Sequence, residues 1–317
     1  MKKKQISIAG IYSKYGIFIL FVVMFIIMSI INSNFLTVYN ISNIAKQIVV
    51  ITILACGEQL MLIAGLIDLS VGSVLALAGC VAASVAVAGN TPLALIVGLL
   101  VGLLCGAVNG AILVMFEIPP FITTLATMMI ARGAAYVYTD GQPISQLGDA
   151  FDWIGQGYVG PIPSSVIIMV VALVITWIIL NETRTGRYIY AIGGNEDAAK
   201  ASGVNIGKIK FFTCAFSGLM AGLAGLILMA RMDSAQPIAG ESYEMDAITA
   251  VVVGGTSMAG GVGNIPGTIV GSCIIGIIKN FMNLQNINSY WQKIVQGIIV
   301  CAAVIIDVKV RKSQSKA

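Results

Sequence analysis

Of the 317 residues in this chain, 58% are apolar and only 10% are charged, whereas a soluble domain carries about 25% charged residues. Such a chain cannot cover itself in water, which excludes a soluble globular protein. Histidine is absent, and the six cysteines lie inside apolar runs without a CxxC pair, so they are expected to be core residues rather than disulfides or metal ligands. We expect no cofactor, no metal and no nucleic-acid partner.

Apolar runs near 18 residues long, typical of helices that cross a bilayer, recur from end to end. A β-barrel would alternate apolar and polar residues instead. The first run follows MKKKQISIAGIYSKYG without an A-x-A-like cleavage site, so the first helix is expected to remain uncleaved. We predict an all-α polytopic membrane protein, a single transmembrane domain over 1–317, with about ten spans at 17–36, 48–66, 70–89, 92–116, 121–138, 163–180, 209–230, 246–259, 266–283 and 291–307.

Two acidic residues stand out early in the chain. Glu58, beside Gln59, gives the second span a polar patch. Asp68 in GLIDLSVG is expected in a tight cytoplasmic turn, where it could simply cap the third span. Because a carboxylate at mid-bilayer costs about 2.5–3.5 kcal/mol, a role in a gate or at a partner contact is the alternative.

The fourth and fifth spans carry two further marks. Gly98, Gly102, Gly106 and Gly110 are four residues apart and form a flat stripe on the fourth span. The stripe either packs tightly within one subunit or lies at a dimer interface or pathway wall. Arg132, inside the fifth span, could line a polar cavity or gate, snorkel outward, or pair with an acidic residue near the outer end.

Positive charge indicates the orientation. With both termini in the cytoplasm, the outer segments contain only Lys46, Arg231, Lys279 and Lys293, and all other Lys and Arg residues except Arg132 are inside. Two loops, about 139–162 and about 231–245, then face outward. Both are acidic, with Asp140, Asp149 and Asp152 in the first and Asp233, Glu241 and Glu244 in the second.

The cytoplasmic stretch 181–208 contains a short charged helix. An asparagine suits its N-cap, acidic residues follow in the first turn, alanines favour the helix, and a glycine stands where the helix should end. Two turns are not stable alone in water, so this helix needs a surface, on another protein or on its own bundle. The residues that define it are Asn195, Glu196, Asp197, Ala198, Ala199, Lys200 and Gly203.

This stretch, GRYIYAIGGNEDAAKASGVNI, resembles the cytoplasmic coupling segment of ABC-importer permeases, which docks into a cleft on the ATPase subunit. GLIDLSVGSVLALAG (65–79), PPFITTLATMMIARGAAYVYTDGQPI (119–144) and AITAVVVGGTSMAGGVGNIPGTIVG are similar to the ribose, galactose and xylose permeases of that family. The resemblance covers nearly the whole chain. Leu66 departs from the usual Gly-Gly-Ile-Asp, and we expect no loss of function from it.

The resemblance implies a permease that passes a simple sugar by alternating access. The only Gly-Lys pair, Gly207-Lys208, is followed by Ile209 and lacks the first glycine of a P-loop, so this chain should not bind ATP. The implied partners are a separate ABC ATPase on the cytoplasmic side, an extracytoplasmic sugar-binding protein, and a second permease, as a homodimer or as a heterodimer.

Two stretches share a weak helix–turn–helix pattern with an isoleucine at the corner: NGAILVMFEIPPFITTLATMMI (109–130) and NFMNLQNINSYWQKIVQGII (280–299). If spans 2–5 correspond to spans 7–10, the offset of five helices indicates an inverted repeat, as in many transporters. Three rival functions stay open at this point: the same machine for a branched-chain amino acid or nucleoside, a stand-alone gradient-driven transporter that would rely on Glu58 or Asp68, and a membrane enzyme. No catalytic constellation supports the last.

Overall fold

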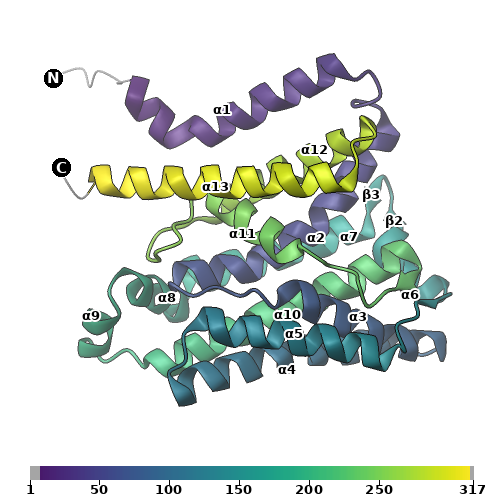
Figure 1. Ribbon diagram of the computed structural model, residues 1–317, viewed down its shortest axis with the longest axis horizontal. Helices are drawn as coiled ribbons and strands as arrows, with labels where there is room; N and C mark the ends of the chain where they lie inside the picture. Colours follow the sequence, from purple (N-terminus) through teal and green to yellow (C-terminus); the bar gives the residue numbers. More distant parts are fainter. Residues whose placement is uncertain (1–7, 315–317) are drawn as a thin grey trace.

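The computed structural model describes residues 8–314, and most of them are helical (Figure 1). The helices of this part of the chain are α1 (Ile8–Ile31), α2 (Val38–Ile63), α3 (Val71–Val87), α4 (Thr91–Phe116), α5 (Pro120–Tyr138), α6 (Asp149–Gln156), α7 (Ser164–Glu182), α8 (Arg184–Gly194), α9 (Glu196–Ala201), α10 (Ile206–Met232), α11 (Tyr243–Val253), α12 (Ile265–Leu284) and α13 (Ser289–Gln314). Two antiparallel pairs of short strands join β1 (Ile144–Ser145) to β4 (Ser234–Ala235) and β2 (Tyr158–Val159) to β3 (Ile162–Pro163).

Within 8–314, five helices are long and apolar enough to cross a membrane: α2, α4, α7, α10 and α12. Shorter apolar stretches cover 16–31, 71–87 and 289–305. These eight segments and α5 fall on nine of the ten expected spans. The one remaining span, the eighth in chain order, was expected over 246–259, and its predicted length is wrong. The helix found there, α11, has 11 residues, about 16 Å at 1.5 Å per residue, and ends before Gly254 and Gly255. Gly255 adopts a left-handed conformation with φ +91°, which ends the helix.

Other boundaries also differ from expectation. α2 begins at Val38 rather than 48, because Thr37 accepts a hydrogen bond from the Asn40 backbone N–H and starts the helix early. Inside the loop expected over 139–162, the structure has α6 and three short strands, and the stretch 184–194 forms α8.

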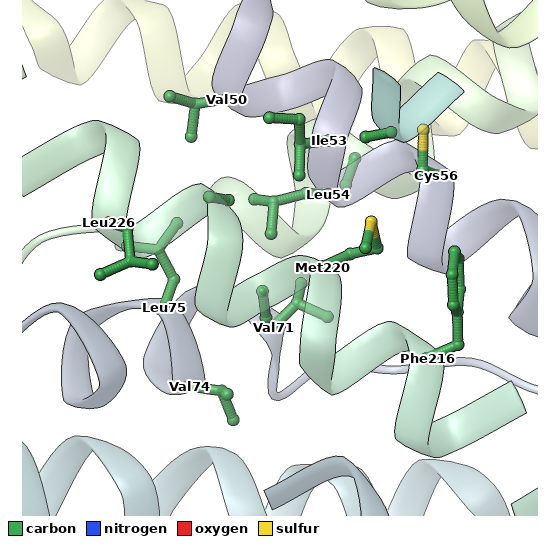
Figure 2. Packing of buried hydrophobic residues seen from close by; sticks show 14 of the residues in the cluster. Val50, Ile53, Leu54, Cys56, Val71, Val74, Leu75, Phe216, Met220 and Leu226 are labelled. Atoms are coloured by element: carbon green, nitrogen blue, oxygen red, sulfur yellow. The ribbon is translucent and has the colours of Figure 1, made fainter. Parts of the chain in front are cut away.

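The core lies between α2, α3 and α10 (Figure 2). Leu54 and Cys56 of α2, Leu75 of α3 and Met220 of α10 are among its buried side chains. Lipid tails are as apolar as these residues, so the helices associate through close packing rather than through the hydrophobic effect. Close packing requires small residues where helices cross.

The glycine stripe on α4 supplies that close approach. Gly102 and Gly106 face Gly222 and Gly218 of α10, and an added methyl group at Gly102 would lie 2.7 Å from the Gly222 Cα. Farther along, Gly98 packs against Leu226 and Gly110 against Phe211. In this single chain the stripe therefore contacts α10 of the same subunit.

The start of α1 and the end of α13 lie at the same end of the bundle as α8 and α9 (Figure 1). We call this the α9 end. The opposite end, which carries α6 and the two strands β2 and β3, is called the α6 end.

Candidate functional site

Two helices, α3 and α11, start inside the bundle rather than at its ends. After α2 finishes at Ile63, residues 64–70 run back into the protein, and Asp68 receives a hydrogen bond from Ser217. Ser217 lies about 17 Å from the first residue of α10 at 1.5 Å per residue, near the middle of that helix. α3 starts there and runs alongside α10 toward the α6 end, with Leu75 against Gly225. The cytoplasmic turn expected for Asp68 is therefore wrong: Asp68 is 1% exposed and deep inside.

α11 is entered from the opposite end. α10 ends at the α6 end, β4 pairs with β1, and residues 236–242 then run back into the bundle. α11 starts there and runs antiparallel to α12, with Ala250 against Gly271. The outward loop expected over 231–245 is thus partly internal, and Glu244 lies on α11, half-buried, rather than in solvent.

The starts of α3 and α11, which we call the half-helix junction, touch through two glycines. A methyl group at Gly240 would lie 2.6 Å from the Gly72 carbonyl oxygen, and one at Gly72 would collide with the Glu244 carboxylate. Gly240 has φ +72°, a conformation that side chains disfavour. Gly72 therefore has to be glycine because another backbone approaches it closely, and Gly240 because of its left-handed backbone conformation.

Neutral groups and one carboxylate anchor the start of α3. Asp68 accepts hydrogen bonds from the Ser70 N–H (2.9 Å), the Ser70 hydroxyl (2.6 Å) and the Ser217 hydroxyl (2.8 Å). Asn109 of α4 donates to the Ser70 hydroxyl (3.0 Å) and accepts from the Thr127 hydroxyl of α5. The N-cap of α3 is Ser70, and Asp68 orients it rather than capping the helix itself. This network ties the break to three other helices.

Glu58 lies beside this break on α2. Its neighbour Gly57 packs directly on Ser217, the residue that donates to Asp68. Glu58 is 0% exposed, and among the described residues no side chain donates a hydrogen bond to its carboxylate, which has only the Asp68 backbone as a contact. A buried carboxyl with so little compensation is costly, which marks Glu58 as a functional candidate.

Arg132 of α5 holds the segment that leads to α11. Its guanidinium donates to the carbonyl oxygens of Pro237 and, at 2.8 Å, Ala239. The sequence left pairing with an outer acidic residue open, and no acidic residue forms an ion pair with Arg132 in the described chain. Because the segment 236–242 has no sheet partner, these charged hydrogen bonds satisfy backbone groups that would otherwise be buried unpaired.

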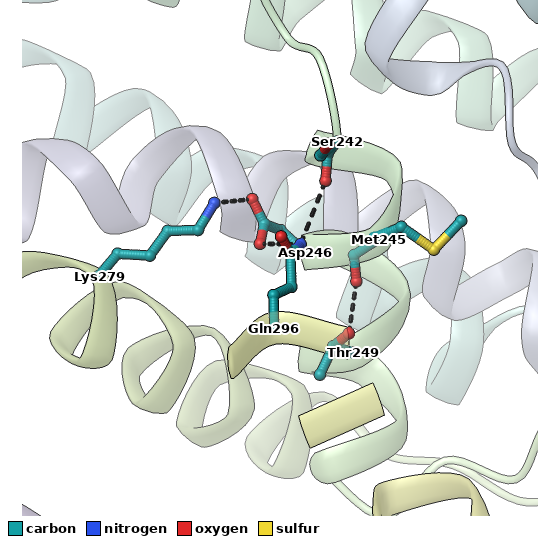
Figure 3. A network of polar contacts seen from close by, with 6 residues as sticks. All are labelled: Ser242, Met245, Asp246, Thr249, Lys279 and Gln296. Atoms are coloured by element: carbon teal, nitrogen blue, oxygen red, sulfur yellow. Dashed lines mark hydrogen bonds and ion pairs between the residues drawn. The ribbon is translucent and has the colours of Figure 1, made fainter. Parts of the chain in front are cut away.

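An ion pair anchors the first turn of α11 (Figure 3). Asp246 is fully buried and accepts from the Lys279 ammonium of α12 and from the Gln296 amide of α13, the latter at 2.6 Å. The Lys279 ammonium also lies 5.2 Å from the centre of the Tyr243 ring. Lys279 was expected in an outer segment, but it is 14 residues into α12 and points inward. Sequence reasoning missed this pair because it placed Asp246 at the start of a full span and counted Lys279, which is near the end of the span expected over 266–283, with the outer segments.

The short charged helix forms as its sequence indicates. Asn195 caps α9 by accepting from the Ala198 N–H at 2.9 Å, and Gly203 follows the helix at φ +82°. Lys210 of α10 pairs with Glu196 at 2.8 Å. Ala199 faces inward and is 5% exposed, so it cannot contact a partner protein. The exposed face of α9, which a partner could contact, consists of Glu196, Asp197, Ala198 and Lys200. A groove of about 440 Å³ separates α9 from α8.

The segment α8–α9 rests on the end of α2, just before the break that leads to α3, and on the loop that follows α11. Gly193 packs against Ile63, the last residue of α2, and against Gly261 in the loop between α11 and α12. The Gly261 N–H donates to the Ile63 carbonyl (2.8 Å), and the Tyr190 hydroxyl donates to the Gly263 carbonyl (2.8 Å). A displacement of α8 would therefore reach the break before α3 and the loop after α11 through direct contacts.

Three sequence candidates thus lie around one place: Glu58 and Asp68 lie at the α3 side of the half-helix junction, and Arg132, more than 60 residues later in the chain, holds the α11 side. The stripe Gly98, Gly102, Gly106 and Gly110 lies elsewhere, along α10. Within 8–314 no group of three or more Cys, Asp or Glu side chains is arranged to hold a metal ion.

Comparisons with known proteins fit this architecture. The family described as "Branched-chain amino acid transport system / permease component" matches residues 40–304. The chain is 46% identical to the ribose import permease protein of Bacillus subtilis (strain 168), over 97% of each chain. It is 45% identical to the ribose import permease protein of Escherichia coli (strain K12), over 90% of this chain and 91% of the relative.

A further relative is the L-arabinose transport system permease protein of Escherichia coli (strain K12), at 39% identity over 96% of this chain and 93% of that protein. No solved structure matches the chain significantly. The match over most of the chain settles the class of protein: this chain is a multi-pass membrane protein and belongs to the family of ABC-importer permease components.

Proposed function

We propose that this chain is the membrane-spanning permease subunit of an ATP-driven importer that carries a monosaccharide of the ribose class into a bacterial cell. The observation that carries the proposal is the 46% identity to a ribose import permease over 97% of both chains. ATP hydrolysis and substrate capture then belong to a separate ABC ATPase and an extracytoplasmic binding protein. A branched-chain amino acid is the second candidate cargo, because the family description names that class.

The α9 end faces the cytoplasm in this proposal, and the α6 end faces outward. The basic residues of the sequence support this orientation, since Arg184, Arg187, Lys200 and Lys208 all fall in or beside α8 and α9. Ten segments then cross the membrane or half of it: α1 to α5, α7 and α10 to α13. α11 is one of the half-crossings, at about 16 Å in a hydrocarbon core of about 30 Å.

The order of the elements supports an inverted repeat of spans 2–5 and 7–10, which are α2–α5 and α10–α13. In each set a long helix is followed by a break that runs back into the bundle, then by a helix that starts inside it. One break enters from the α9 end and the other from the α6 end. Transporters with such repeats bind their cargo near the midplane, where broken helices meet.

The half-helix junction is accordingly the proposed gate. When the ATPase subunits close, the α8–α9 segment shifts and moves Ile63, which precedes the break at 64–70, and Gly261, which is joined to the segment 236–242 through α11. The breaks at 64–70 and 236–242 part or close in response, which opens the pathway to one side at a time. Glu58, Asp68 and Arg132 are the polar groups that such a movement would present to sugar hydroxyls. A second copy of the chain is proposed to complete the pathway.

The cargo is tested in proteoliposomes that contain the full chain with its ATPase and binding protein. We expect ATP-dependent uptake of labelled ribose, competed by other monosaccharides and unaffected by leucine or uridine. Uptake of leucine in place of ribose would show that the cargo is a branched-chain amino acid, the second candidate. Uptake that persists without the ATPase, on an ion gradient alone, would overturn the assignment to an ATP-driven importer.

The coupling role of α9 is tested with Lys200→Glu and Ala198→Trp, which alter its exposed face. Both variants should insert normally and lose most sugar uptake while ATP hydrolysis continues. Lys200→Arg is the matched control, because it keeps the charge and should retain uptake. Normal uptake by Lys200→Glu and Ala198→Trp would exclude this surface as the ATPase contact.

A further inference from the structure

The α6 end carries a polar pocket that neither the half-helix junction nor the α8–α9 segment uses. Its volume is about 780 Å³, and it lies between the first turns of α2, the last turns of α10 and α12, and α6. Amides dominate its lining, two cations contribute to it, and no described carboxylate does. In a chain with so few polar residues, this concentration requires an explanation.

The two cations, Lys46 and Arg231, line the same pocket and are uncompensated. The Arg231 guanidinium donates to the Lys46 carbonyl oxygen at 3.1 Å, which holds it against α2. The Lys46 ammonium lies 4.5 Å from the centre of the Tyr158 ring. Neither cation forms an ion pair with a carboxylate of the described residues. The site is therefore suited to an anion, and a planar guanidinium together with an ammonium in one pocket suits phosphate in particular.

The amides around these cations are available for further hydrogen bonds. The side chains of Asn43 and Gln47, one helical turn apart on α2, form no hydrogen bond with other described residues, and both line the pocket. An amide offers two N–H donors and one carbonyl acceptor, which matches hydroxyl groups that both donate and accept. The ligand best recognised by this set carries a phosphate and hydroxyls.

The depth of the pocket points to a lipid. α2 has 26 residues, about 39 Å at 1.5 Å per residue, whereas the hydrocarbon core is about 30 Å thick. Its first turns therefore extend to the level of the headgroups. Tyr39 and Tyr158 lie there, as aromatic residues do at membrane interfaces. Leu36 and Val38, next to the pocket in the chain, are 51% and 86% exposed, where acyl chains would cover them.

We propose that this pocket binds the headgroup of an anionic phospholipid in the outer leaflet, with the phosphate between Lys46 and Arg231 and the headgroup hydroxyls at Asn43 and Gln47. A phosphatidylglycerol headgroup has both kinds of group. The bound lipid would fix the outer ends of α2, α10 and α12 against one another, at the end of the molecule opposite to the α9 segment.

The test uses the full-length chain reconstituted in vesicles of dioleoylphosphatidylcholine with and without dioleoylphosphatidylglycerol, followed by gentle extraction and native mass spectrometry. We expect retained phosphatidylglycerol, reduced about tenfold in Lys46→Gln/Arg231→Gln, since about 1.4 kcal/mol of charge-assisted binding corresponds to a factor of ten. Because Arg231 also bonds to α2, Lys46→Gln alone is the variant that keeps the fold and should still lower retention. Lys293→Gln, at an exposed lysine outside the pocket, is the matched control and should retain the lipid.

Competition distinguishes the source of the phosphate. Excess inorganic phosphate or glycerol 3-phosphate should not displace the lipid, and displacement would assign the pocket to a soluble phosphate compound instead. Equal retention by Lys46→Gln, the double variant and the unchanged chain would overturn the site. A variant that keeps its lipid but loses stimulation by the binding protein would make the pocket a protein-docking surface. None of these results depends on which sugar is transported.

Discussion

The starts of α3 and α11 touch, yet they are anchored by different chemistry. Around α3, Asp68, Ser70 and Asn109 form a network of short, directional hydrogen bonds from hydroxyl and amide groups. The start of α11 is anchored mainly by a lysine and an arginine. Lys279 neutralises Asp246, and Arg132 donates to backbone carbonyls of the segment that leads to α11. Hydrogen bonds weaken steeply with misalignment, whereas Coulomb attraction falls only with the inverse of distance.

This difference assigns a role to each half of the junction. A network such as that of Asp68 retains its energy in one geometry only, so the start of α3 should be the fixed side. An ion pair such as Asp246–Lys279 keeps much of its energy over a small displacement, so the start of α11 should be the side that shifts during transport. The predictions below alter one side at a time.

Removal of Lys279 should have the largest effect. Lys279→Met leaves Asp246 buried with the Gln296 amide but without its counter-charge, and loss of one member of a buried pair costs about 3–5 kcal/mol. The free energy of unfolding, measured by steric trapping in bicelles, should fall by that amount. The double variant Asp246→Leu/Lys279→Met should recover most of the loss, because no charge is then left alone.

The matched control for that prediction is the exposed pair Lys293–Glu241, whose side chains are both 56% exposed. Lys293→Met should cost less than about 1 kcal/mol, as exposed pairs generally do. Equal losses from Lys279→Met and Lys293→Met would show that the start of α11 is not anchored by its buried charge.

Arg132→Met should have the next largest effect. It removes charged hydrogen bonds from one guanidinium nitrogen to the carbonyls of Pro237 and Ala239, and because Arg132 is only half-buried the two together should contribute about 1.5–3 kcal/mol. Amide hydrogen exchange should accelerate in residues 236–242 and stay unchanged in 64–70. Arg132→Lys keeps the charge and should recover part of the protection. Faster exchange in both segments would mean that the two sides of the junction are not anchored independently.

Asn109→Ala should have a smaller effect on the opposite side. The variant removes neutral hydrogen bonds to Ser70 and Thr127, and neutral bonds contribute about 0.5–1.5 kcal/mol each. Exchange should accelerate in 64–70 and not in 236–242, the reverse of Arg132→Met. Asn181→Ala, which removes an exposed amide bonded within its own helix, is the control and should change neither segment.

The sequence predicted the class of protein, the positions of most helices and the caps of α9, because apolar runs and capping residues act locally. It also singled out Glu58, Asp68 and Arg132, because a charged group inside an apolar run is visible without any fold. It could not place them together, since their proximity depends on breaks where the chain turns back into the bundle. Such a break reads as a turn or loop, which is why Asp246 and Lys279 were missed.

The smallest expected effect concerns pH at the outer start of the segment that leads to α11. Burial and the neighbouring Asp233 carboxylate raise the pKa of Asp152 on α6 to about 6, above its ordinary value of 3.8. The folded chain then binds this proton more tightly than the unfolded chain does, so this group's contribution to stability is lost as the pH rises from about 4 to about 6. The melting temperature should decline over that range, and Asp152→Asn should remove about 1–2 °C of the decline, because the carboxyl is partly solvated. Asp140→Asn, in the same outer region, is the control and should leave the decline unchanged. A decline that is the same in Asp152→Asn would show that the carboxylates at Asp152 and Asp233 do not interact, and the charged character of the α11 side would then begin only at Arg132.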